Sequence, residues 1–186
     1  MKIIKISIFI LTSILFSVLP THGQNKDPEF VGDTYLLKAD SSHVDLDKEF
    51  GNYTSGVSWS SNSWNALSLE IAGGKAQTRF STSEKLQLVV RAVDNNSDPL
   101  TIITIYKFKA KKNTRSVVLS EDNSGTLMKS RTNSNDMILF SGKKYGTSSY
   151  LIILRTLKAG EYGIVVSNPN SKDQKRTIVS CFGIDE

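Results

Sequence analysis

The stretch LQLVVRAV, residues 86–93, is the part of the chain that decides the predicted fold. In an extended conformation Leu86, Leu88, Val90 and Ala92 would lie on one face, because successive side chains of a strand point to opposite faces. Four apolar residues in strict alternation are typical of a β-strand with one side in a core. We therefore expect a strand here, with a protein core on one side of it.

Similar short runs, rich in β-branched and aromatic residues, recur through residues 34–186. Clusters of Gly, Asn, Asp and Ser separate them, and the runs lack the 3.6-residue periodicity of an amphipathic helix. About ten short strands with closely spaced turns predict a single all-β domain, an antiparallel β-sandwich of jelly-roll or immunoglobulin-like type. A closed barrel is the alternative arrangement.

The N-terminal segment has the features of a secretory signal peptide over residues 1–23. Two lysines lie among the first five residues, residues 6–19 are apolar and Gly23 is a small residue at the end. A transmembrane anchor is the alternative, but the apolar run is shorter than the roughly 20 residues that a bilayer-spanning helix needs. We expect cleavage near Gly23, a polar leader over residues 24–33, and a secreted or periplasmic protein with no membrane insertion after cleavage.

Charge is unevenly distributed along the chain. The whole sequence carries a formal net charge of +5, but residues 24–100 hold 7 basic and 11 acidic side chains, whereas residues 101–186 hold 14 and 7. This asymmetry predicts an anion-binding or partner surface, or acidic and basic strands that are neighbours in the fold. The basic run from Lys107 to Arg115 has no aromatic residues on its exposed face, so we expect a solvated strand edge and no nucleic-acid binding.

A cluster of aromatic and amide side chains provides the first candidate site. Trp59, Asn62, Trp64 and Asn65 lie in the segment VSWSSNSWN, residues 57–65. An exposed tryptophan has an apolar ring that can stack on a sugar, while neighbouring amide and hydroxyl groups bond the sugar hydroxyls. These four residues form the predicted binding site for a glycan or protein ligand, and burial of the tryptophans in a core is the alternative.

A second candidate site lies in the segment SHVDLD, residues 42–47. In an extended strand His43, Asp45 and Asp47 would project from one face and offer imidazole and carboxylate ligands to a divalent metal. A solvated strand face opposite Val44 is the alternative interpretation. Apart from this metal, we expect no cofactor.

The sequence contains no motif that predicts catalysis. It lacks the Gly-x-Ser-x-Gly and His-Glu-x-x-His patterns and a phosphate-binding glycine loop. Its single cysteine, Cys181, is expected to be a small buried residue rather than a nucleophile. The leading hypothesis is an exported non-enzymatic binding or accessory module. The alternatives are a hydrolase of the cell envelope or of polysaccharide, and a structural subunit that self-associates through oppositely charged surfaces.

The C-terminal part of the chain carries a resemblance to other proteins. The segments LKAGEYGIV, residues 157–165, and CFGID, residues 181–185, are similar to the ending of uncharacterised secreted β-rich proteins of Gram-negative bacteria. The resemblance implies an exported all-β domain. It implies no activity and no catalytic residue.

Overall fold

The computed structural model describes residues 26–57, 64–82, 85–123, 129–132 and 135–186. The predicted signal peptide lies outside these residues, as do Trp59 and Asn62 of the first candidate site. Within the described residues the chain forms thirteen strands and one short helix, α1, which spans Pro99–Ile102. Among these residues no helix is long and apolar enough to cross a membrane.

Five strands form an open antiparallel sheet. Its order is β10 (Phe140–Tyr145), β11 (Ser149–Leu154), β6 (Gln87–Arg91), β1 (Thr34–Leu37) and β2 (His43–Asp45). The strand predicted over residues 86–93 is β6, and it lies at the centre of this sheet with β11 and β1 on its two sides.

The remaining strands form a larger sheet that closes on itself. Its order is β12 (Gly160–Val166), β7 (Ile103–Ala110), β8 (Thr114–Asn123), β4 (Trp64–Ala72), β3 (Asp47–Val57) and β13 (Arg176–Asp185), with β5 (Arg79–Ser81) and β9 (Lys129–Thr132) attached to β13 and β8. Closure occurs because β12 and β13 also pair with each other. We call the ring of six strands the closed sheet.

The prediction of an all-β fold with antiparallel sheets is confirmed, but the predicted sandwich is not clearly present. The difference arises from β13, which is ten residues long. Residues 176–181 pair with β3 and residues 179–184 pair with β12, so one strand joins what would otherwise be two edges. One layer is therefore open, whereas the other is a closed barrel.

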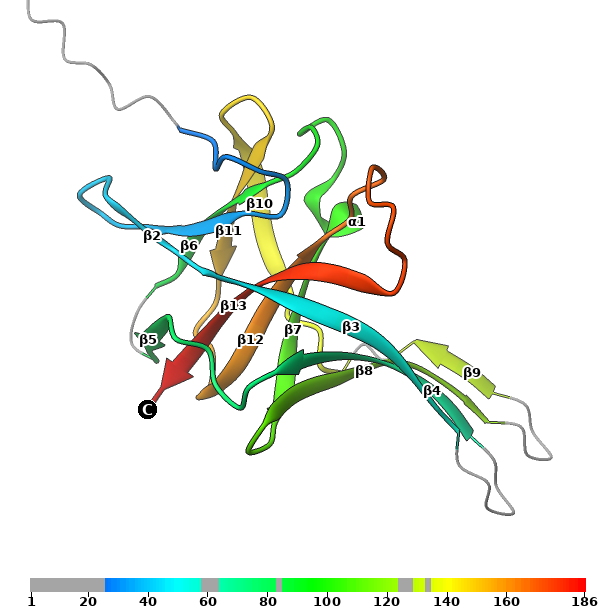
Figure 1. Ribbon diagram of the computed structural model, residues 1–186. Helices are drawn as coiled ribbons and strands as arrows, with labels where there is room; N and C mark the ends of the chain where they lie inside the picture. Colours follow the sequence, from blue (N-terminus) through cyan, green and yellow to red (C-terminus); the bar gives the residue numbers. More distant parts are fainter. Residues whose placement is uncertain (1–25, 58–63, 83–84, 124–128, 133–134) are drawn as a thin grey trace, which may run out of the picture.

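The main core lies between the open sheet and the facing wall of the closed sheet (Figure 1). Leu86, Leu88, Val90 and Ala92 all belong to it, as the alternation predicts. From the closed sheet, strands β7, β12 and β13 contribute the fully buried side chains Ile105, Ile164 and Phe182.

A second core fills the interior of the closed sheet. Its buried residues are Leu69, Ile71, Ala76, Phe108, Val117, Val179 and Cys181. Burial raises the pKa of the Cys181 thiol, so the group stays protonated and inert, as expected from the sequence. Space inside is limited: a Cβ added at Gly163 would lie 2.6 Å from Val179 Cγ1 and 2.7 Å from Phe108 Cε2.

Candidate functional site: a cleft beneath the N-terminal segment

Residues 26–33, predicted as a polar leader, are bound to the open sheet. The Asp27 carboxylate accepts hydrogen bonds from the backbone N–H of Thr147 at 2.9 Å and from its hydroxyl at 2.6 Å. The Arg91 guanidinium donates to the carbonyl of Pro28 at 3.2 Å. Backbone pairing between Gly32 and Arg91 fixes the far end of the segment. These contacts hold residues 26–33 against the open sheet, where the segment forms one wall of a cleft.

A cleft of about 520 Å³ lies between this segment and strands β1 and β2. The volume is within the range of small-molecule sites, which span roughly 300–1,000 Å³. The cleft is lined by Lys26, Asp27, Pro28, Glu29, Phe30, Asp33, Thr34, Tyr35, His43, Asp45, Leu46 and Lys48. Its lining thus combines aromatic rings with charged and hydrogen-bonding groups.

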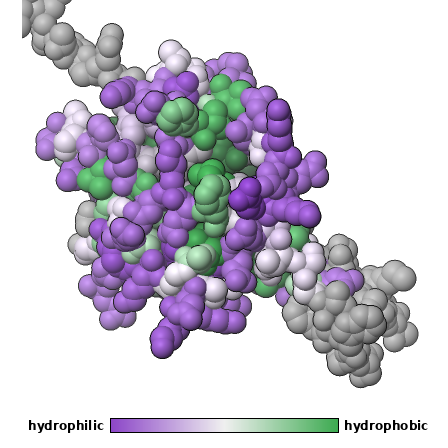
Figure 2. All heavy atoms as spheres, viewed as in Figure 1, coloured by the Kyte–Doolittle hydropathy of each residue, from purple (hydrophilic) through white to green (hydrophobic). Residues whose placement is uncertain are grey.

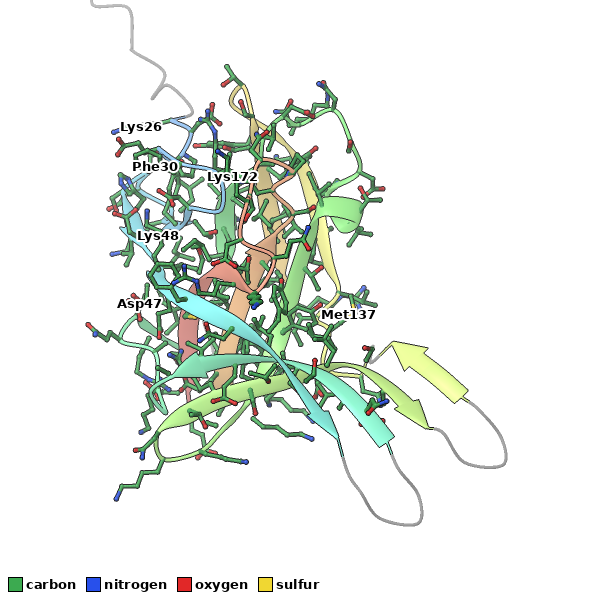
Figure 3. The ribbon with its side chains drawn as sticks, turned by 45° about the vertical axis from the view of Figure 1, so that its right-hand side comes forward. Lys26, Phe30, Asp47, Lys48, Met137 and Lys172 are labelled. Atoms are coloured by element: carbon green, nitrogen blue, oxygen red, sulfur yellow. The ribbon has the colours of Figure 1, made fainter. Side chains whose placement is uncertain are left out.

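Phe30 presents an exposed aromatic ring at the cleft. Its side chain is 58% exposed, although phenylalanine is normally buried. The Lys48 ammonium lies 5.3 Å from the ring centroid and 2.9 Å from a carboxylate oxygen of Asp33. The Phe30 N–H also donates to Asp33, at 3.3 Å. Figure 3 shows Lys26, Phe30 and Lys48 on the same side of the molecule.

The floor of the cleft contains two further rings. The Tyr35 and His43 rings have their centroids 4.8 Å apart at an interplanar angle of 42°. Tyr35 is almost fully buried, and its hydroxyl donates to the carbonyl of Lys26. Burial raises the pKa of Tyr35, so the phenol stays neutral near pH 7. His43 is exposed and can contact a ligand.

Two carboxylates at the cleft, those of Asp27 and Asp33, are engaged in contacts with neighbouring groups. Burial alone would raise the pKa of the Asp27 carboxyl, but hydrogen bonds from Thr147 and its neighbours outweigh it, so the pKa is lowered. Asp33 is paired with Lys48. Both carboxylates therefore serve to position the walls of the cleft.

The structure does not bring the three predicted metal ligands together. His43 and Asp45 line the cleft, but Asp47 lies elsewhere: its carboxylate accepts hydrogen bonds from the Thr78 hydroxyl at 2.7 Å and from the Thr78 N–H at 3.0 Å. Residue 46 is the point at which the chain leaves β2 in one sheet and enters β3 in the other, so the three side chains do not share a face. No group of three or more potential metal ligands occurs in the part of the chain that the structure describes.

The described part of the aromatic candidate site, Trp64 and Asn65, lies on a different part of the molecule from the cleft. Trp64 and Asn65 begin β4, and Asn65 is exposed and pairs with Val57 and Asp122. Figure 1 shows β3, β4, β8 and β9 extending beyond the rest of the domain, on the side away from residues 26–33. Trp64 and Asn65 therefore do not contribute to the cleft.

Phe30, Tyr35 and Lys48 were not among the residues predicted from the sequence to form a site. Phe30 carried one usable signal, because it is the single aromatic residue in an otherwise polar segment, residues 24–33. Tyr35 and Lys48 lie in strands with ordinary composition, and only the tertiary fold brings them to Phe30.

An apolar surface outside the cleft provides a comparison for Phe30. Phe50 on β3 and Ile178 on β13 are directly paired and exposed, and the Arg176 guanidinium lies 5.4 Å from the Phe50 ring centroid. Figure 2 shows apolar residues gathered near the centre of this face, over β13 and β3. Phe50 is 61% exposed and, like Phe30, has a cation over its ring, but it does not line the cleft.

The chain matches no model of a known protein family, and no curated protein is similar to it. We therefore infer the function from the geometry of the cleft.

Proposed function

We propose that this protein is an exported, non-enzymatic binding module that holds a neutral glycan in the cleft beneath residues 26–33. The observation that carries the proposal is the exposed Phe30 ring at a cleft of oligosaccharide size, with polar groups beside it. The glycan hypothesis from the sequence is thus retained, but we assign it to Phe30 and its neighbours.

The chemistry of the cleft suits a sugar because both kinds of contact are available. An aromatic ring offers an apolar face for the C–H side of a pyranose, and hydroxyl groups need donors and acceptors in fixed positions. His43, Asp45 and Lys48 supply such groups to the same cleft. Since the walls are held by the Asp27 and Asp33 contacts, the site is formed in advance, which lowers the entropic cost of binding.

The hydrolase alternative receives less support from the same residues. Glycoside hydrolysis uses two carboxyl groups, one of which has a raised pKa so that it can protonate the leaving group. The hydrogen bonds of Asp27 move its pKa in the opposite direction, and Asp33 is paired with Lys48. Binding without hydrolysis is the function that fits these constraints.

Two further elements complete the proposal. The predicted signal peptide, residues 1–23, supports export to the periplasm or the medium, where free glycans are available. The open sheet and the facing wall of the closed sheet enclose a common core, which supports describing the domain as a modified sandwich.

The proposal is tested by calorimetric titration of the purified domain with a panel of neutral oligosaccharides. We expect saturable binding to at least one of them, lost in Phe30→Ala and retained in Phe50→Ala. The two variants remove equally exposed rings, so they differ only in whether the ring lines the cleft. Absence of binding across the panel, or equal losses in both variants, would contradict the proposal.

A further inference from the structure

Five exposed lysines gather at one end of the closed sheet. Lys109, Lys111 and Lys112 lie at the end of β7 and in the turn to β8, Lys75 lies between β4 and β5, and Lys158 precedes β12. Figure 1 shows these turns together at the lower end of the molecule, whereas residues 26–33 lie near its top. The lysines are thus distant from the cleft.

Contacts in the structure confirm that the three turns are neighbours. The N–H of Gly73 donates to the carbonyl of Asn113 at 2.8 Å, which joins the turn that carries Lys75 to the β7–β8 turn. The Lys107 ammonium donates to the carbonyl of Ala159 at 3.2 Å, which joins β7 to the residue that follows Lys158. The turns and strand ends that carry the five exposed lysines therefore lie together at one end of the domain, which we call the lysine end.

Among the described residues Lys109, Lys111, Lys112 and Lys158 form no salt bridge, whereas Lys75 lies close enough to Asp185 to help lower the pKa of its carboxyl. Three other cations of the domain are paired: Lys48 with Asp33, Arg115 with Glu49, and Arg176 with Asp173. Acids near the lysine end are already engaged, since Arg79 binds both the buried Glu161 and the exposed Asp185. The positive charge at this end is therefore largely uncompensated.

We infer that the lysine end docks the protein onto an anionic lipid surface, through contacts of the ammonium groups with lipid phosphates. Clusters of about four to eight basic residues are typical of protein segments that bind anionic lipids, and each basic residue near the surface contributes about 1 kcal/mol. The lysines project from turns and strand ends rather than into the cleft, an arrangement that suits a broad surface better than a single bound chain. Lysine ammonium groups act as point charges and need no fixed geometry at a phosphate. The inference is independent of the proposed glycan binding.

The test is co-sedimentation of the whole domain with vesicles at 0.15 M salt. One vesicle preparation contains phosphatidylglycerol and phosphatidylcholine in a 3:7 ratio, and the other contains phosphatidylcholine alone. We expect binding to the first preparation and not to the second. The triple variant Lys109→Glu, Lys111→Glu, Lys112→Glu should weaken the affinity for the anionic vesicles about 100-fold. Each basic residue near an anionic membrane raises this affinity by a factor on the order of five.

A matched control separates the lysine end from net charge. The triple variant Lys143→Glu, Lys144→Glu, Lys172→Glu makes the same change in charge at exposed lysines of β10 and of the β12–β13 loop. Figure 3 shows Lys172 in the upper part of the molecule. We expect this variant to bind within a few-fold of the parent. The inference would be overturned if both variants weakened vesicle binding equally, or if the parent did not bind the anionic vesicles. It would also be overturned if the protein bound soluble dextran sulfate but not vesicles.

Discussion

The Nη1 atom of Arg79 lies 2.8 Å from Oε1 of Glu161, a carboxylate whose side chain is only 5% exposed. The second oxygen of this carboxylate accepts a hydrogen bond from the N–H of Ala76 at 2.7 Å. Arg79 lies on β5 and Glu161 on β12, while Ala76 lies in the turn between β4 and β5. The pair therefore fixes the three-residue strand β5 and its preceding turn against the closed sheet.

Replacement of Arg79 by Met should destabilise the protein strongly. It leaves the Glu161 carboxylate buried with one neutral donor, and breaking a buried ion pair in this way costs about 3–5 kcal/mol. Chemical denaturation monitored by tryptophan fluorescence measures the loss. Arg176→Met is the control, because its partner Asp173 is exposed and such pairs contribute little. A similar small change in both variants would show that the Arg79–Glu161 pair does not hold β5 in place.

Gly163→Ala should destabilise the interior of the closed sheet by about 1–3 kcal/mol, the usual cost of overpacking a core. The added Cβ would meet Val179 and Phe108 at distances that require the backbone or both side chains to move. Gly56→Ala, on β3, is the matched control because a Cβ there meets no atom within 4 Å. Equal thermal midpoints for the two variants would contradict close packing of β12 against β13.

Asp47 should make the free energy of unfolding depend on pH in the acid range. Partial burial would raise its pKa, but hydrogen bonds from Thr78 and Gln77 outweigh burial and lower the pKa below 3.8. A carboxyl whose pKa is lower in the folded than in the unfolded state stabilises the fold at pH values above its unfolded-state pKa. This stabilisation is lost as the pH falls through its folded-state pKa. We expect the free energy of unfolding to fall below about pH 4.

The variant Asp47→Asn identifies this contribution. Compared with the parent it should be less stable at pH 7, and the difference should shrink as the pH falls and the Asp47 carboxyl becomes protonated. The measurement is urea denaturation at a series of pH values. A difference that stays constant over the whole range would rule out the hydrogen-bonded carboxylate as its source.

Cys181 should react with a thiol reagent only when the protein unfolds. The thiol is completely buried inside the closed sheet and its pKa is raised by burial, so both access and thiolate formation are suppressed. We expect no reaction with Ellman's reagent over minutes in the native state and one equivalent in 6 M guanidinium chloride. Rapid reaction in the native state would mean that the closed sheet opens readily.

The sequence pattern was sufficient to predict strands wherever one face is apolar. The alternation in residues 86–93 correctly predicts Leu86, Leu88, Val90 and Ala92 as core residues. The same alternation does not identify a single core face of β7, where Ile105 faces the main core and Phe108 faces the interior of the closed sheet. Both faces of this strand are buried, so alternation alone cannot assign a core side.

The closed sheet and the cleft depend on contacts that are distant in sequence. Residues 47–51, at the start of β3, lack apolar alternation because Asp47, Glu49 and Gly51, which share one face of the strand, are charged or lack a side chain. Glu49 is partly buried and pairs there with the fully buried Arg115 from β8. Likewise, Phe30 becomes part of a site only when residues 26–33 dock on the open sheet. One sequence without spatial information does not show these pairings.

The most direct test of the proposed function is an NMR titration of the isotope-labelled domain with an oligosaccharide. The proposed function predicts saturable shifts of backbone amides in residues 26–35, 43–46 and 48, the segments that contribute the cleft lining, with little change around Trp64 and Asn65. Saturable shifts confined to the β3–β4 hairpin, with the amides of residues 26–48 unchanged, would contradict it and would return the glycan site to the tryptophan segment.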